Sequence, residues 1–138
     1  MLGVHDAAHA ENGAASQNYV IVPVSCPVAD RAAGAPKLSG ASRVCIRRGS
    51  LLGDIYQREE AAEEYFCNYE VNTRYQERLE KAGLRLSAFG ENGEVRAVEL
   101  PRHRFFLATL FLPQLAKAQP HPVIMAYLEA ALRTPAAA

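Results

Sequence analysis

One cysteine stands in a setting that could do chemistry. Cys67 lies in "EEYFCNYEVN", where the alternation of an extended strand would place Tyr65, Cys67 and Tyr69 on one face and Glu64 on the other. A thiol between two phenols could act as a catalytic or redox group. The alternative is that Cys67 is a small buried apolar side chain, as free cysteines often are. The sequence leaves both interpretations open.

Two other cysteines complete the set. Cys26 follows an apolar run at 19–24 and precedes a proline, which places it near a strand end, where sites of open α/β sheets often lie. Cys45 stands between Val44 and Ile46, and we expect it in the core. The three are widely spaced and odd in number, which fits neither a disulfide framework nor a CxxC pair. A reducing cytoplasm is the location that we predict.

The histidines give weaker signals. His5 and His9, with Glu11 nearby, would share one face of a helix and could bind a metal. No third ligand can be placed, so we predict no metal and no cofactor, although the "HAE" side chains could still line a pocket. His103 lies in "LPRHRF", where a solvated turn is the simpler interpretation and a small-anion site the alternative.

Composition limits the partners. The chain has 138 residues, with Lys plus Arg and Asp plus Glu at 15 each and no basic face, which argues against nucleic acid and anionic membranes. No apolar run is long enough to span a bilayer, and the first residues lack the pattern of a signal peptide. We expect a single domain over 1–133 and a disordered tail over 134–138.

The elements that must position these residues can be read from periodicity. Helices are predicted over 72–83 and 121–134, the second with an apolar stripe that lies against a sheet. A tight hairpin is predicted at "GENGE", which carries an Asn-Gly pair. The carboxylate run Glu59, Glu60, Glu63 and Glu64 is expected on an exposed short helix or loop. Six strands are predicted, at 19–24, 43–47, 64–71, 84–89, 95–100 and 104–111; the apolar stripe of the second helix comprises Val123, Ile124, Tyr127, Leu128, Ala131 and Leu132.

Four segments, taken in order, resemble the second half of the glutaminase domain of CTP synthase, a class I glutamine amidotransferase. They are "MLGVHDAAHAE", "GSLLGDIYQREEAAEEYFCNYEVNTRYQERLEKAGLRLSA", "GEVRAVELPRHRFFLATLFLPQ" and "PHPVIMAYLEAAL". The F-x-P-Q ending is similar to that of CTP synthase C-terminal region-related proteins, some of which are selenoproteins. The resemblance implies an α/β fold: a partial flavodoxin-like class I amidotransferase sheet with a small antiparallel extension, its N-terminal strands and nucleophile elbow missing.

The departures from the family pattern bear on function. The family strand ends F-H-P-E, whose histidine and glutamate activate the catalytic cysteine, and the matching positions here are Leu112 and Gln114. The family arginine before "YEVN", which holds the substrate carboxylate, is matched by Asn68, which offers no charge-assisted pair. We therefore expect no glutaminase activity. The strand is expected to be kept for packing, with Phe105, Phe106, Leu107, Leu110 and Phe111 in the core.

Three interpretations remain. The first is an enzyme or small-molecule-binding domain whose pocket at the old active site uses Cys67 and Cys26 as candidate thiols. In that pocket Glu64, Tyr65, Asn68 and Tyr69 would contact the substrate. The second is a pseudoenzyme that binds a ligand or a partner. The third is a truncated fragment that needs its missing N-terminal half or pairs as a homo-oligomer.

Overall fold

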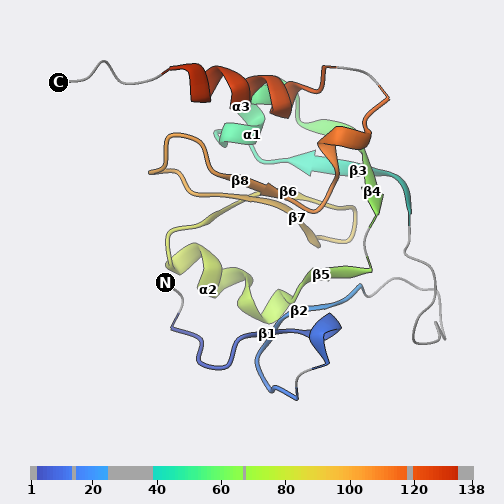
Figure 1. The fold of residues 1–138 in the computed structure, drawn as a ribbon, viewed down its shortest axis with the longest axis vertical. Coiled ribbons are helices and arrows are strands. Elements are labelled where there is room, and N and C mark those ends of the chain that lie inside the picture. Colours follow the sequence, from blue (N-terminus) through green and yellow to red (C-terminus); the bar gives the residue numbers. More distant parts are fainter. Residues whose placement is uncertain (1–2, 14, 25–38, 67, 118–119, 134–138) are drawn as a thin grey trace.

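The described part of the chain contains two β-sheets (Figure 1). The computed structural model describes residues 3–13, 15–24, 39–66, 68–117 and 120–133. Within them the larger sheet has the strand order β4-β3-β6-β7-β8 with antiparallel pairings throughout, and the smaller has the order β1-β2-β5. The strands are β1 (Ala8–His9), β2 (Tyr19–Pro23), β3 (Ser39–Ile46), β4 (Glu60–Phe66), β5 (Tyr69–Val71), β6 (Arg85–Phe89), β7 (Val95–Glu99) and β8 (Leu107–Thr109).

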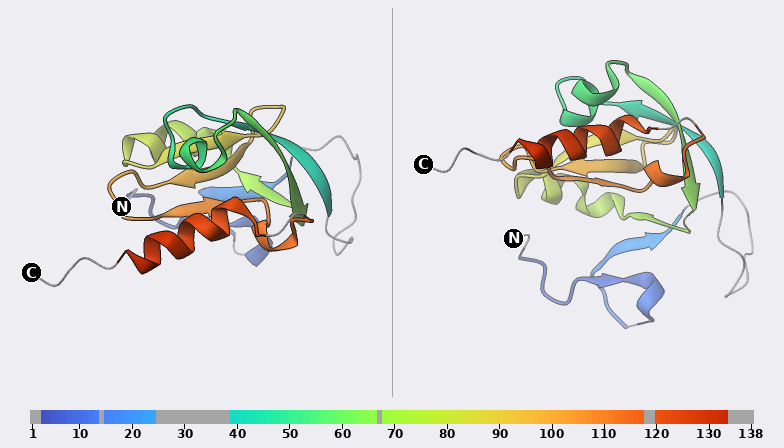
Figure 2. Two further views of the ribbon diagram at one scale, coloured as in Figure 1. Left: turned by 90° about the horizontal axis from the view of Figure 1, so that it is seen from above. Right: turned by 45° about the horizontal axis from the view of Figure 1, so that its top comes forward.

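Helices cover both faces of the larger sheet. The α-helices are α1 (Leu51–Tyr56), α2 (Gln76–Lys81) and α3 (Pro122–Leu132), and the 3-10 turns are η1 (Ala10–Asn12), η2 (Thr73–Tyr75) and η3 (Pro113–Leu115). α1 and α3 pack against each other on one face, and α2 lies on the other (Figures 1 and 2). The main core on the α1 and α3 side comprises Val44, Ile46, Leu52, Tyr56, Ala61, Ala88, Ala97, Phe111 and Val123. A smaller core under α2 comprises Leu79, Leu86 and Val95.

The fold matches the expected class, an α/β fold with a partial amidotransferase sheet and an antiparallel extension. The predicted hairpin is confirmed, because β6 and β7 pair across the "GENGE" turn with Gly93 in the left-handed region at φ 81°. Among the described residues the antiparallel sheet is the larger of the two. The reason is that β4, which was expected as loop or short helix over much of its length, adds a long strand to β3.

Other expectations about the elements were wrong. The strand predicted at 64–71 is two strands, β4 and β5, which belong to different sheets. Of the strand predicted at 104–111, the structure keeps only Leu107–Thr109, and Phe106 is 41% exposed rather than part of the core. α3 is confirmed, but only Val123 of the predicted apolar stripe is buried. The tail 134–138 lies outside the described residues.

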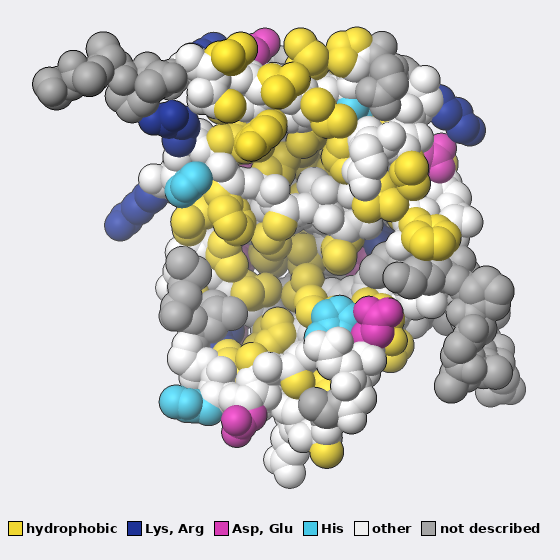
Figure 3. Space-filling view, viewed as in Figure 1, with side chains coloured by type: hydrophobic (Ala, Val, Ile, Leu, Met, Phe, Trp, Pro, Cys, Tyr) yellow, Lys and Arg dark blue, Asp and Glu magenta, His cyan; other side chains and the backbone are white. Residues whose placement is uncertain are grey.

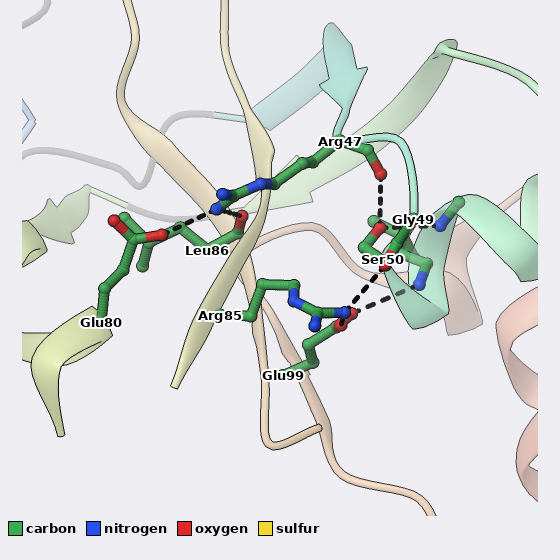
Figure 4. A network of polar contacts seen from close by, with 9 residues as sticks. Arg47, Gly49, Ser50, Glu80, Arg85, Leu86 and Glu99 are labelled. Carbon is green, nitrogen blue, oxygen red and sulfur yellow. Dashed lines mark hydrogen bonds and ion pairs between the residues drawn. The ribbon is translucent and has the colours of Figure 1, made fainter. Parts of the chain in front are cut away.

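α1 was not predicted, because it is short and contains a glycine. Its N-cap is Ser50, whose hydroxyl donates to the Arg47 carbonyl at 2.6 Å and accepts the Gly53 amide at 3.0 Å. The turn before it is tied to the sheet (Figure 4): Arg85 donates to the Gly49 carbonyl at 2.8 Å and to the Glu99 carboxylate at 3.0 Å. This turn chemistry, and not helix propensity, fixes where α1 begins.

Gly53 should not tolerate alanine, although alanine favours helices over glycine by about 1 kcal/mol. A Cβ at Gly53 would lie 2.9 Å from the Arg47 carbonyl oxygen and 3.3 Å from the Ser50 hydroxyl. We expect Gly53→Ala to lower the free energy of unfolding by about 1–3 kcal/mol in urea titrations, because it overpacks the cap. Asp54→Ala, at the next and exposed position, is the control and should change it by about 0.5 kcal/mol or less.

The β6–β7 turn holds a carboxylate with an altered pKa. Partial burial pushes the pKa of Glu94 up. Hydrogen bonds from its own backbone N–H, from Arg96 and from the Asn92 amide outweigh burial, so the pKa of Glu94 lies below its usual range. Its ionised form is therefore favoured in the folded protein, and the stabilisation is present above the unfolded pKa of about 4.3.

Acid should remove this stabilisation, which is lost as the pH falls through the lowered pKa of folded Glu94. We expect Glu94→Gln to unfold more easily at pH 7 and to lose less stability than wild type when the pH is lowered below about 4. Urea titrations across this range measure both effects. Glu91→Gln in the same exposed turn is the control, and equal acid dependence of the two variants would contradict the assignment.

Candidate functional site

Three polar side chains from separate elements meet in the core next to β4. The Tyr56 hydroxyl at the end of α1 donates to Glu63 Oε1 in β4 at 2.6 Å. His121 Nε2, at the N-cap of α3, lies 3.1 Å from Glu63 Oε2 and 3.2 Å from the Tyr56 hydroxyl. The Glu63 and His121 side chains are only 5% and 4% exposed. We call this group the Tyr56–Glu63–His121 clasp.

The hydrogen bonds fix the protons of the clasp. His121 Nδ1 accepts the Val123 amide at 3.2 Å and caps α3, so in the neutral ring Nε2 carries the hydrogen and donates to Glu63. Burial raises the pKa of Tyr56 far above its usual range, and the hydrogen bond to Glu63 and its charge add to this. The phenol therefore stays protonated. The Glu63 carboxyl group is within hydrogen-bond distance of both partners, and no ring nitrogen is left to act as a base without breaking the cap.

A cavity of about 360 Å³ opens beside the clasp. Glu63 and His121 form part of its wall, and small side chains from β3, β4 and the segment after η3 make room for it. Lys117 Nζ stands 3.7 Å from Glu64 Oε1, and the Arg58 guanidinium lies over the Tyr56 ring at 5.4 Å. The lining is Ala41, Arg58, Ala62, Glu63, Glu64, Ala116, Lys117, His121 and Pro122. A cavity of this size, with charges of both signs, can hold a small polar molecule.

Leu112 and Gln114 do not line this cavity, but they lie on the segment that leads from β8 to Ala116, which does. After β8 the chain passes through the buried Phe111, and the Leu112 amide then donates to the Glu64 carbonyl at 2.8 Å. Leu112 is half-buried, while Gln114 lies in η3 and is exposed. Neither side chain offers a base. Phe111 fills the core as expected for a strand kept for packing.

The residues proposed to surround a substrate are not brought together on one strand. Tyr65 lies on β4, where its ring covers Gly40 of β3. Tyr69 lies on β5 in the other sheet, with its ring centroid 4.8 Å from that of His9. The expected alignment on one strand face is therefore wrong, because the chain passes from one sheet to the other at Asn68. Cys26 and Cys67 lie outside the described residues.

The other candidates have local structural roles. His9 Nδ1 accepts the Glu11 amide at 3.1 Å and caps η1. In the turn before β8, His103 Nδ1 accepts the Phe105 amide at 3.2 Å. Cys45 was expected in the core and is only half-buried, because its side chain alternates with those of the buried Val44 and Ile46. Across the described ranges no three His, Cys, Asp or Glu side chains are placed to hold a metal ion.

Sequence reasoning missed the clasp. Glu63 was assigned to an exposed carboxylate run, and Tyr56 and His121 were not singled out. A signal was present: in a strand over 60–66, alternation would turn Ala61 and Glu63 inward, and a buried carboxylate needs partners. The partners themselves lie 7 and 58 residues away in the chain, so only the fold identifies them.

The clasp should contribute strongly to stability. We expect His121→Ala to lower the free energy of unfolding by about 3–5 kcal/mol, because it leaves a buried charge without its partner and removes a cap. His121→Asn keeps a capping oxygen but does not reach Glu63, so the difference between the two variants measures the cap alone. Tyr56→Phe should cost about 1.5–3 kcal/mol. Chemical denaturation measures all three, and losses below 1 kcal/mol throughout would contradict a stabilising role for the hydrogen bonds to the buried Glu63.

Sequence comparison finds CTP synthases among the relatives of this chain. The chain is 44% identical to CTP synthase of Aeropyrum pernix over 108 residues, which is 75% of the chain and 20% of that protein. It is 35% identical to CTP synthase of Rhodococcus opacus over 145 aligned positions, covering 96% of the chain and 24% of that protein. The chain thus spans a fifth to a quarter of the length of these relatives. No family model matches it.

Comparison with solved structures also finds CTP synthase. The glutaminase domain of Trypanosoma brucei CTP synthase, solved with bound acivicin, matches 99% of the chain with a TM-score of 0.84 and 34% identity, and the chain covers 54% of that structure. In the described part of the chain, no helix is long and apolar enough to cross a membrane. The chain therefore belongs to the class I glutamine amidotransferase-like domains of the CTP synthase type, of whose fold it carries a part.

Proposed function

We propose that this domain does not hydrolyse glutamine and instead binds a small molecule at the cavity beside the clasp. The observation that carries the proposal is the end of β8, where Leu112 and Gln114 stand in place of the family's histidine and glutamate. A leucine cannot accept the proton of a thiol, and a neutral glutamine cannot stabilise an imidazolium. The position that matches the substrate-binding arginine is Asn68, which carries no charge.

The cavity supports the binding part of this proposal. Its wall includes Glu64, whose carbonyl accepts the Leu112 amide, so the backbone of one of the two substituted positions is bonded to a residue of the wall. Lys117 and Glu64 form an ion pair at 3.7 Å and place one charge of each sign on the wall of the cavity. Arg58 has no carboxylate partner among the described residues and supplies a second cation. Thiol chemistry at Cys67 or Cys26 stays a prediction, as do pseudoenzyme status and a cytoplasmic location.

A glutaminase assay tests the proposal. We expect no ammonia release from L-glutamine above the protein-free control, because loss of triad members lowers turnover by about 10³-fold or more. Acivicin, the ligand of the trypanosomal domain, should neither raise the melting temperature nor add mass to the chain. A CTP synthase serves as the positive control. Glutamine-dependent ammonia release that scales with the protein and is lost in Cys67→Ser would overturn the proposal.

A second interpretation is that the chain is one part of a larger amidotransferase-like unit. The specific observation in its favour is that the chain matches nearly all of its own length but only part of the trypanosomal domain. In this interpretation, further polypeptide would contribute residues to the cavity and to the site around Leu112 and Gln114.

A further inference from the structure

Two further cavities meet at the start of α1. The larger, of about 580 Å³, lies between α1, α3 and the segment before β8. The smaller, of about 330 Å³, lies between the turn that begins α1 and the segment that joins β7 to β8. Leu51, Asp54 and Arg104 line both cavities, and we call the two together the α1–α3 groove. Both volumes are within the range of about 300–1,000 Å³ that is typical of small-molecule sites.

The wall of the larger cavity is mostly apolar. The Phe105 ring stands edge-on to the Tyr127 ring, with the two centroids 5.6 Å apart. Ala126 and Ala130, one turn apart on α3, leave space beside Phe105 because their side chains are small. An apolar group of a ligand is favoured here, since it leaves water. The apolar lining is Leu51, Ile55, Phe105, Pro122, Met125, Ala126 and Ala130.

Two unpaired charges of opposite sign stand where the cavities meet. The Asp54 carboxylate and the Arg104 guanidinium line both cavities, and both residues are exposed. Neither side chain has a hydrogen-bond or ion-pair partner within the ranges that the structure describes. The other charged side chains of the groove are paired: Arg85 with Glu99 at 3.0 Å, and Arg133 with Glu129 at 3.9 Å.

His103 adds a hydrogen-bond donor to the smaller cavity. Its Nδ1 accepts the Phe105 amide at 3.2 Å, so in the neutral ring Nε2 carries the hydrogen. Figure 3 shows Lys or Arg side chains and a histidine at the left edge of the molecule, where the segment between β7 and β8 lies in Figure 1, next to apolar side chains over α3. N–H donors of this kind beside a guanidinium suit a carboxylate.

We propose that the α1–α3 groove binds the zwitterion of an apolar α-amino acid. The carboxylate of the ligand binds Arg104 and His103, its ammonium group binds Asp54, and its side chain lies against the apolar wall of the larger cavity. The two unpaired charges favour this class over a simple anion or a simple amine. Either of those would pair one charge and place a like charge beside the other.

This site is distinct from the cavity beside the clasp, with which it shares only Pro122 among the lining residues. The proposal is independent of the proposed function, because it requires neither the loss of glutaminase activity nor a ligand beside the clasp. A glutaminase assay therefore leaves it unaffected, and a binding experiment at the groove leaves the proposed function unaffected.

Isothermal titration calorimetry of the full chain tests the proposal, with L-phenylalanine as the probe. Three analogues each lack one of the groups that the groove recognises: hydrocinnamate lacks the ammonium group, phenethylamine lacks the carboxylate, and glycine lacks the side chain. We expect saturable one-to-one binding of L-phenylalanine. Each analogue should bind about tenfold more weakly or worse, because it loses a charge-assisted hydrogen bond or the burial of an aromatic ring.

Substitutions assign the binding to the groove. Asp54→Asn and Arg104→Gln should each weaken the binding of L-phenylalanine by about tenfold or more. Asp54→Asn should not weaken hydrocinnamate, and Arg104→Gln should not weaken phenethylamine, because each analogue lacks the group that the substituted residue binds. Arg102→Gln and Glu91→Gln are the matched controls, since both residues are exposed and line neither cavity. Urea titration checks that all four variants remain folded.

Four outcomes would overturn the proposal. The first is the absence of saturable binding of L-phenylalanine, and the second is an equal affinity for glycine, hydrocinnamate or phenethylamine. The third is a loss of affinity in the control variants as large as that in Asp54→Asn and Arg104→Gln. The fourth is a loss in Lys117→Gln with none in Asp54→Asn, which would place the amino acid in the cavity beside the clasp.

Discussion

The positions of α1 and α3 on the larger sheet depend on the buried carboxyl group of Glu63. An ionised carboxylate in the core is tolerated only with full hydrogen bonding, and its two donors come from the end of α1 and the start of α3. Because His121 also caps α3 through its other nitrogen, one ring fixes both the position and the first turn of that helix. The two helices that cover one face of the sheet are therefore held to β4 by polar bonds as well as by apolar contact.

A second buried carboxylate, that of Glu99, contacts the other end of α1. Glu99 of β7 is 2% exposed and is paired with Arg85 of β6 at 3.0 Å, while its second oxygen faces the Leu52 amide at 3.4 Å (Figure 4). α1 is thus held by one carboxylate at its start and one at its end. Such a short helix would not persist alone, since isolated helices of this length are unstable in water. Its stability comes from these contacts and from Leu52 and Tyr56 in the core.

The segment after β8 is held in place by its backbone and by one aromatic side chain. Phe111 remains buried and the Leu112 amide is bound to Glu64, so the backbone there is held whatever the side chains are. The side chains at the two degenerate positions are free to change because the strand is positioned by its backbone and by one aromatic ring. Pro113 then opens a 3-10 turn that leads toward the cap of α3. Phe111 provides the packing here, whereas any chemistry would depend on the side chains at the neighbouring positions 112 and 114.

Local patterns predicted the parts of the fold that depend on near neighbours. The β6–β7 hairpin and α3 followed from a turn pair and a helical repeat, and four ordered segments predicted the amidotransferase-like class. Local patterns failed where tertiary contact decides. The run 64–71 was split because its two ends pair with different sheets, and α1 was missed because its stability lies in distant carboxylates.

The same distinction between local sequence patterns and tertiary contacts applies to the candidate site. That Leu112 and Gln114 supply no base and no anion is evident from their side-chain chemistry alone. The burial of Glu63 between Tyr56 and His121, and the second apolar face of α3 without a cover among the described residues, became visible only in the folded chain. Alternation along β4 indicates that Glu63 faces inward, but the partners of a buried carboxyl group and the cover of an apolar face are supplied by segments distant in the chain.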